Sequence, residues 1–327
     1  MLVDIDPGAL LLDLQSGQLF RLNQSAALVW RRHLLGESAA ETAHALSERY
    51  EIAEARARRD VDNALQISRV AVSPAVAATP TEFHYERRPD GYMFSRRGQP
   101  LFLIDSEGRH LSRAPSADLD RDETRCLLSS VAPKLLSLRG ETVLHASAVS
   151  VADRVMVFSG ASGAGKTTTA RAMVKAGAGP IAEDKLVVRV GAAGVDVAVD
   201  TESVVAAWVD DAAAALFAGQ PALCDRLAAV ARCPTLPLAE VGFLSADRRA
   251  ADSFAATVLE PAAAASAIFS NSFYGSDEPA DWRRQLTISA AVGRMVRVFE
   301  LTAPAGVPGL VAAAEQTTRA GTLKPGG

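Results

Sequence analysis

The feature that most constrains this chain is a glycine-rich octapeptide, Gly160-Ala161-Ser162-Gly163-Ala164-Gly165-Lys166-Thr167. Glycines allow positive φ angles, so the backbone can wrap closely around an anion with successive N–H groups pointing inward. The apolar run at 154–159 predicts a strand before the octapeptide, and the spacing at 167–176 predicts a helix after it. The positive end of that helix dipole adds to the attraction for an anion. The segment therefore predicts a strand–loop–helix unit that holds a phosphate.

The last two residues of the octapeptide make the prediction more specific. In loops of this pattern the lysine bridges the β- and γ-phosphates and the hydroxyl residue binds Mg²⁺, so ATP with Mg²⁺ is the expected ligand. We expect the nucleotide to contact the loop and the first helical turn. The residues concerned are Gly160, Ser162, Gly163, Ala164, Gly165, Lys166, Thr167 and Thr168.

Two acids and one histidine are candidates for the chemistry. Glu183 and Asp184 end an apolar stretch seventeen residues after Lys166, about one helix and one strand further along. A carboxylate there can bind Mg²⁺ or take the proton of an attacking hydroxyl. His145 lies in the middle of an apolar, strand-like run. The alternative interpretations are a pair of surface acids in a turn and a histidine satisfied within the core.

Composition excludes several classes of protein. The chain has 327 residues, a formal net charge of −4 and a pI near 5.8, which argue against a broad basic surface for nucleic acid. The three cysteines form no CxxC pair, so no structural zinc site is predicted. The first residues lack a basic signal region, and no apolar run approaches the ~18 residues of a membrane span. We therefore expect a cytoplasmic protein that spans no membrane.

The sequence divides into three parts. Residues 1–70 predict a small unit of two strands (10–14 and 19–22) and three helices, with Asn23 and Ser38 as helix caps. Residues 71–81 contain two prolines among small residues and are expected to form a linker. Residues 82–327 are expected to form one α/β domain. Within it, residues 82–140 predict an antiparallel meander with a helix, and residues 141–327 predict the nucleotide-binding core.

The core resembles the HPr kinase family. Four segments match the family, in the same order over about fifty residues. They are the run Leu144-His145-Ala146-Ser147-Ala148-Val149, the octapeptide, Gly179 and the pair Glu183-Asp184. The resemblance implies a P-loop kinase fold of the HPr-kinase-like type. It also implies that this chain can form a homo-oligomer, although the sequence does not settle the oligomeric state.

Carried over to this chain, the resemblance implies a role for each residue. Lys166 and Thr167 hold the phosphates and Mg²⁺, and the acidic pair supplies the catalytic base and a metal contact, assigned to Asp184. His145 lies beside that pair. The family pattern has two aspartates where this chain has Glu183 and Asp184, so the division of roles within the pair stays open. An EVRGxG-like second motif is absent from the sequence, so HPr is not the expected substrate.

The N-terminal unit is similar to PqqD-like proteins. The similarity covers about 65 residues and implies a small winged-helix domain that recognises a leader peptide. Such domains add an extended peptide to a sheet edge. The matching residues are Leu12-Asp13-Leu14, Gly17, Leu19, Phe20, Leu22-Asn23, Ala26-Ala27, Trp30 and the segment 38–50.

Together the two resemblances predict a kinase that transfers the γ-phosphate of ATP to a Ser or Thr hydroxyl of a ribosomally made precursor peptide. One alternative is a small-molecule kinase whose N-terminal unit is regulatory. A second is a nucleotide-gated peptide chaperone that transfers no phosphate. The identity of the peptide, its acceptor residue, and the choice between ATP and diphosphate stay open at this point.

Overall fold

The first part of the chain forms a small sheet followed by three helices. The computed structural model describes residues 1–5, 8–13, 19–66, 83–115, 117, 119–249, 253–273 and 279–323. The elements of this part are β1 (Leu2–Ile5), β2 (Gly8–Leu12), β3 (Leu19–Leu22), α1 (Gln24–Leu34), α2 (Ala39–Tyr50) and α3 (Glu54–Gln66). All three strands are antiparallel neighbours, in the order β1-β2-β3. The sequence predicted two strands here, and the structure adds β1.

Side-chain caps define where two of these helices begin. The Asn23 side chain accepts a hydrogen bond from the backbone N–H of Ala26 at 2.9 Å. The backbone N–H of Glu41 donates to Ser38 Oγ, and the backbone N–H of Ser38 donates to Glu41 Oε2. Each bond satisfies a backbone donor that the first helical turn leaves without a partner. Both predicted caps are confirmed, whereas the predicted linker at 71–81 lies outside the described residues.

A second sheet carries the predicted meander. Its elements are β4 (Phe83–Arg88), β5 (Gly91–Arg96), β6 (Gln99–Asp105), β7 (His110–Arg113) and, after them, α4 (Arg121–Leu138). A distant segment joins this body: β13 (Ala222–Leu223) pairs with β7, and α6 (Thr201–Phe217) packs on α4. The 3₁₀ helix Asp225–Arg232 covers α6. The division expected at residue 140 misses this return of the chain.

The largest sheet carries the glycine-rich loop. Its strands are β8 (Thr142–Val151), β9 (Arg154–Ser159), β10 (Gly179–Ala182), β11 (Lys185–Val190), β12 (Val195–Ala198), β14 (Thr235–Arg249), β15 (Ala255–Val258), β16 (Ser272–Phe273) and β17 (Arg297–Pro304). Strands β9, β14 and β17 run parallel, and β8 is antiparallel to β9. The valine-rich runs are buried here, as expected for strands covered on both faces.

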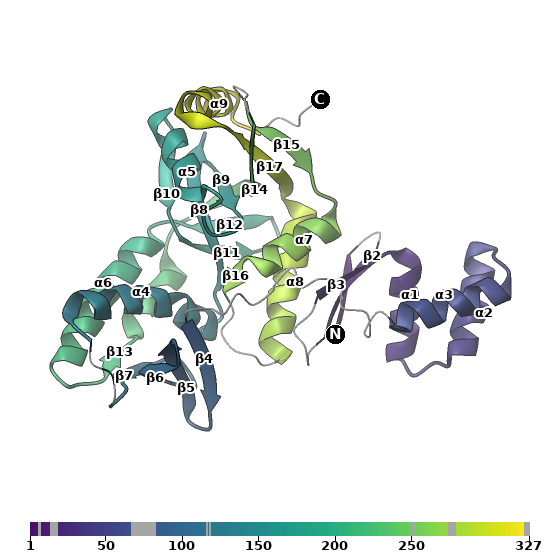
Figure 1. Cartoon of the computed structure of the whole chain (residues 1–327), viewed down its shortest axis with the longest axis horizontal. Helices are drawn as coiled ribbons and strands as arrows, with labels where there is room; N and C mark the ends of the chain where they lie inside the picture. The colour runs from purple at the N-terminus through teal and green to yellow at the C-terminus, as the bar shows by residue number, and fades with distance from the viewer. Residues whose placement is uncertain are drawn as a thin grey trace.

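Helices cover both faces of the large sheet (Figure 1). On one face lie α5 (Lys166–Lys175) and α9 (Gly306–Ala320), which pack on Met156 and Phe299. On the other lie α7 (Pro261–Ser270) and α8 (Pro279–Met295), which pack on Val157 and Val298.

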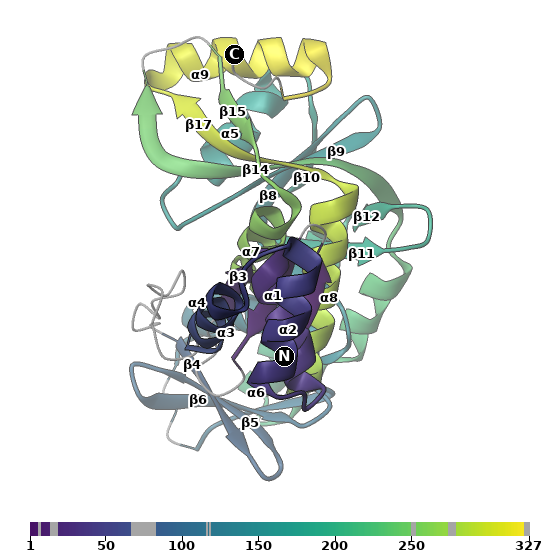
Figure 2. The same cartoon turned by 90° about the vertical axis from the view of Figure 1, so that its right-hand side faces the viewer.

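The N-terminal sheet packs on the outer side of α7 and α8 (Figures 1 and 2). Ile5, Leu10 and Leu12 form one buried cluster with Phe269 of α7 and Leu286 of α8. The two helices are therefore buried between two sheets. This position explains why α7 is alanine-rich and apolar around most of its circumference.

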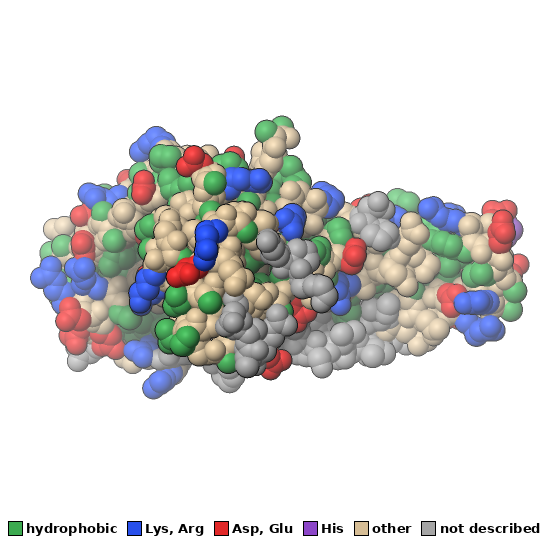
Figure 3. Space-filling model, turned by 90° about the horizontal axis from the view of Figure 1, so that it is seen from above, with side chains coloured by type: hydrophobic (Ala, Val, Ile, Leu, Met, Phe, Trp, Pro, Cys, Tyr) green, Lys and Arg blue, Asp and Glu red, His purple; other side chains and the backbone are tan. Residues whose placement is uncertain are grey.

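The surface carries mixed charge. In the view of Figure 3, the described basic and acidic side chains are interspersed, and neither sign forms a broad patch on that face. Within the described residues, each helix is too short or too polar to traverse a bilayer.

Candidate functional site

The glycine-rich loop joins the end of β9 to the start of α5. Gly160 has φ 131°, and a Cβ at this position would lie 2.7 Å from the carbonyl oxygen of Leu244 on β14. Only glycine fits such a close approach of two backbones. Gly165 caps α5 with φ 91°, and no side chain caps the helix. The strand and the helix predicted around the loop are confirmed, and the positive end of α5 faces the loop.

Lys166 lies inside the loop. Its side chain is buried, and Nζ donates to the carbonyl oxygens of Gly160 at 2.9 Å and Ala161 at 3.1 Å. Burial lowers the pKa of Lys166 below its ordinary value, while the nearby negative charge of Asp184 opposes that shift. The ammonium group is therefore held beneath the loop, close enough to Asp184 to interact with it electrostatically.

The other predicted nucleotide contacts differ in their exposure. Ser162, Gly163 and Thr168 are exposed, Gly165 and Thr167 are half-buried, and Gly160 and Ala164 are buried. The outer part of the loop and the first turn of α5 are thus accessible to a ligand.

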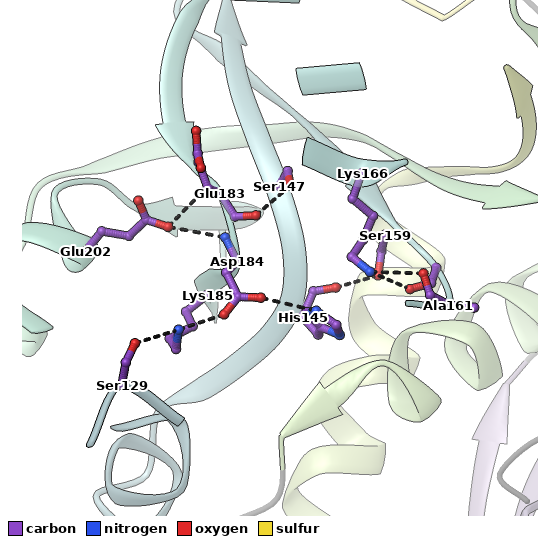
Figure 4. Close-up of polar contacts among 11 residues, drawn as sticks. Ser129, His145, Ser147, Ser159, Ala161, Lys166, Glu183, Asp184, Lys185 and Glu202 are labelled. Carbon is purple, nitrogen blue, oxygen red and sulfur yellow. Dashed lines mark hydrogen bonds and ion pairs between the residues drawn. The ribbon is translucent and has the colours of Figure 1, made fainter. Parts of the chain in front are cut away.

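His145 and Asp184 meet at the same end of the large sheet (Figure 4). His145 lies on β8 directly opposite Lys185 of β11, and Asp184 is the residue before Lys185. His145 Nε2 is 3.2 Å from Asp184 Oδ1, with side chains 37% and 52% exposed. The sequence indicated both residues as candidates, and the structure brings them together in a position open to solvent.

Two cationic or donor groups hold the Asp184 carboxylate. The hydrogen bond from the His145 ring and a 2.6 Å contact from Lys185 Nζ to Oδ2 keep the pKa of Asp184 well below its usual range, although partial burial acts in the opposite direction. The hydrogen bond from His145 is the largest contribution. Asp184 is therefore anionic at neutral pH, as a metal ligand or an acceptor of a hydroxyl proton must be.

The side chain of Glu183 points away from this pair. Its carboxylate forms a bidentate ion pair with Arg171 on α5, with distances of 2.9 and 3.1 Å. Its carbonyl oxygen accepts a hydrogen bond of 2.6 Å from Ser147 Oγ. The two adjacent acids thus lie in different surroundings, and only Asp184 contacts His145.

Three further residues support Asp184 and were not predicted. Lys185 Nζ also donates to Ser129 Oγ of α4 at 3.3 Å. Glu202 Oε1 accepts the backbone N–H groups of Glu183 at 2.7 Å and Asp184 at 3.2 Å, which fixes the turn between β10 and β11. The sequence could have indicated Lys185 as a site residue, because it directly follows the acidic pair. No sequence pattern indicates Glu202 or Ser129, because only the fold brings α4 and α6 to this turn.

The donor groups fit a Mg²⁺ ion shared with a nucleotide. Within the described residues, no three His, Cys, Asp or Glu side chains gather as a metal site of their own. Mg²⁺ in nucleotide sites uses one or two protein oxygens together with phosphate oxygens and waters. The hydroxyl of the half-buried Thr167 and the exposed Asp184 carboxylate are oxygen groups of the kind that such an ion could use.

The segment after α7 contacts His145. The backbone N–H of His145 donates to the carbonyl oxygen of Asn271 at 2.8 Å, and the ring of Phe273 on β16 lies 5.8 Å from the His145 ring between centroids. Because Phe269 at the end of α7 packs on the N-terminal sheet, that sheet and His145 contact the same short stretch of chain.

Comparison with known proteins bears on the N-terminal part. The family model described as "Coenzyme PQQ synthesis protein D (PqqD)" matches residues 8–69. The match begins at β2, so β1 lies outside it. No curated protein matches the chain. The prediction of a PqqD-like domain at the N-terminus is confirmed, and the resemblance of the rest to HPr kinases stays a prediction.

Proposed function

We propose that this chain is an HPr-kinase-like phosphotransferase that moves the γ-phosphate of ATP to a Ser or Thr hydroxyl of a ribosomally made precursor peptide docked on the PqqD-like domain. One observation carries the proposal: the glycine-rich loop with the buried Lys166 and the contacting pair of His145 and Asp184 lie at the same end of one sheet.

The loop supplies the donor side. The backbone of residues 160–165 and the N-terminus of α5 surround the β- and γ-phosphates, and Lys166 exchanges its two carbonyl contacts for phosphate oxygens. Thr167 and Asp184 would hold Mg²⁺, which would supply neutralisation of charge on the phosphate oxygens. In this arrangement most of the protein's contribution is positioning and charge stabilisation.

Asp184 supplies the acceptor side. The acceptor O–H donates to the Asp184 carboxylate; as the new O–P bond forms and the bond to ADP breaks, the proton passes to that carboxylate. A carboxylate of depressed pKa is a weak base, but a loose phosphoryl-transfer transition state needs little deprotonation beforehand. His145 and Lys185 keep Asp184 anionic and oriented. Glu183 has a structural role here, since it binds Arg171.

The N-terminal sheet supplies the peptide site. Among the described residues, β1 and β3 are its terminal strands. The β1 side is covered by α8, whose Arg294 donates to the carbonyl oxygen of Asp4 at 3.2 Å. We therefore assign peptide addition to the edge of β3, where main-chain hydrogen bonds provide affinity and side-chain pockets provide selectivity.

The test combines nucleotide binding with mass spectrometry. The full chain is incubated with ATP, Mg²⁺ and each short peptide encoded beside its gene, and we expect one phosphate on one of those peptides. Lys166→Ala should weaken ATP binding about 10- to 100-fold in calorimetry, because a charge-assisted contact is lost. Unchanged ATP affinity and turnover in this variant would contradict the proposal.

The same experiment separates the alternatives. Phosphate on a small metabolite, with none on any peptide, identifies a small-molecule kinase. ATP binding without a phosphorylated product identifies a nucleotide-gated peptide chaperone. Replacing ATP by diphosphate as donor decides between these two phosphate sources.

A further inference from the structure

A pocket lies next to the catalytic carboxylate, between α4 and α6. Its volume is about 390 Å³, within the range of natural ligand sites. Ser129 and Cys126 of α4 line one side, and Val205, Ala206 and Val209 of α6 line the other.

Two pocket residues contact the acidic turn directly. Lys185 lines the pocket, and its Nζ joins Ser129 Oγ to Asp184 Oδ2. Glu202 lines it too, and accepts the backbone N–H of Asp184. In Figure 4, Asp184 lies between these groups on one side and His145 with the phosphate loop on the other. A molecule in the pocket is thus next to the carboxylate, on the side away from the loop.

The charges in the pocket indicate an uncharged occupant. The positive charge of Lys185 is paired with Asp184, and Arg125, also in the lining, is paired with Asp210. Glu202 is engaged by backbone donors. An anionic ligand would have to break one of the two ion pairs, and a cationic ligand would have to compete with the backbone N–H groups for the Glu202 carboxylate. The buried side chains of Val205 and Val209 instead offer an apolar wall.

We infer that this pocket is the acceptor subsite and determines specificity: it takes an uncharged, apolar side chain that neighbours the reacting hydroxyl of the peptide. The inference rests on the proposed function. The apolar side chain packs on Val205 and Val209, and the hydroxyl beside it reaches Asp184. Lys185 and Ser129 bind main-chain carbonyl oxygens of the same segment.

The test fills the pocket from its rim. Ala206 is exposed on α6 and lines the pocket, so Ala206→Trp should block it without burying a new group in the core. Ala214 is exposed further along the same helix and is not in the lining, so Ala214→Trp is the matched control. With the peptide phosphorylated in the preceding experiment, we expect the peptide KM of Ala206→Trp to rise about tenfold or more, as steric changes in apolar pockets do. The KM for ATP should stay as in wild type.

Covalent modification of a cysteine in the pocket lining gives a second test of the inference. Cys126 is exposed, whereas burial raises the pKa of both Cys224 and Cys233, so a maleimide should react first at Cys126. Labelling with N-ethylmaleimide should lower phosphate transfer to the peptide and leave ATP affinity unchanged. Cys126→Ser should be resistant to this inhibition.

The outcomes distinguish the two proposals. Equal peptide KM values for Ala206→Trp and Ala214→Trp, with transfer intact, overturn the pocket assignment alone. A substrate peptide with a charged residue on each side of its acceptor also overturns it. If the wild-type chain phosphorylates only a free metabolite, or nothing, the proposed function falls and the peptide subsite with it.

Discussion

The two sheets on either side of α7 and α8 are held in place by different means. The large sheet has helices on both faces, and its strands are buried runs of valine and other apolar residues. The N-terminal sheet has three short strands. One face packs on Ala27 of α1, and the other on Phe269 and Leu286, which lie more than two hundred residues away in sequence. A small unit cannot bury enough surface alone, so it uses the core of its neighbour.

This difference matters for function. The glycine-rich loop depends on the ends of β9 and β14, whereas the position of the N-terminal sheet depends on α7. The end of α7 in turn leads to Asn271, whose carbonyl oxygen accepts the backbone N–H of His145. A change of an exposed residue at the loop end of the large sheet, such as Asp184, should therefore affect the proposed chemistry alone, and a change in the small sheet should affect both its own stability and the end of α7.

The largest expected effect is on chemistry alone. Asp184→Asn removes the negative charge that, in the proposed function, accepts the hydroxyl proton, and turnover should fall about 10²- to 10⁴-fold in steady-state kinetics. Glu183→Gln is the matched control, because it changes the adjacent acid, which pairs with Arg171. We expect less than a tenfold loss for this variant, in keeping with a surface ion pair. If the two variants lose activity equally, the assignment of Asp184 is wrong.

The next effect is on the interface between the sheets. Leu10 is fully buried against α7 and α8, and Leu10→Ala should cost about 2–5 kcal/mol of the free energy of unfolding of this region. Hydrogen exchange should rise in β1–β3 and α7 while β9 and β14 stay protected. Leu35 is 79% exposed, so Leu35→Ala should change stability by no more than ~0.5 kcal/mol. Unaltered exchange in α7 would show that the two sheets are independent.

A smaller effect is confined to the N-terminal unit. Ser38→Ala removes the hydroxyl that caps α2, and denaturation should show a loss of about 1 kcal/mol in that unit. Ser38→Asp keeps a capping oxygen and should recover most of this loss. ATP affinity should be the same in both variants, because α2 contacts α1 and α3 rather than the large sheet.

The smallest expected change is in the protonation of Asp184, which should stay ionised throughout the neutral pH range. The folded-state pKa of Asp184 lies below its unfolded value of about 3.9, so its stabilising contribution is complete above that value and is lost as pH falls through the folded pKa. NMR of the carboxyl carbon should show no titration of Asp184 between about pH 5 and 8. In His145→Phe the pKa should rise, because the largest stabilising contact is gone. A wild-type titration near pH 4 or above would contradict the observed contacts.

Much of the architecture could be predicted from local signals. The caps at Asn23 and Ser38 were predicted because a side chain and a backbone donor three residues apart form a self-contained contact. The strand and helix around the loop followed from apolar spacing. The extra strand β1 was missed because its stability comes from pairing with β2 and from Ile5 packing on α7 and α8.

The residues of the candidate site also fall into two groups, those that the sequence indicated and those that only the fold brought together. By itself the sequence determined that a glycine-rich loop would precede a helix, and which histidine and acids were candidates, since those are properties of residue type and spacing. Only the tertiary structure decided that Asp184 faces His145 while Glu183 turns to Arg171, because adjacent residues leaving a strand point in opposite directions. It alone also brought Ser129 and Glu202 to the same turn, since contacts between α4, α6 and β11 depend on how the whole chain packs.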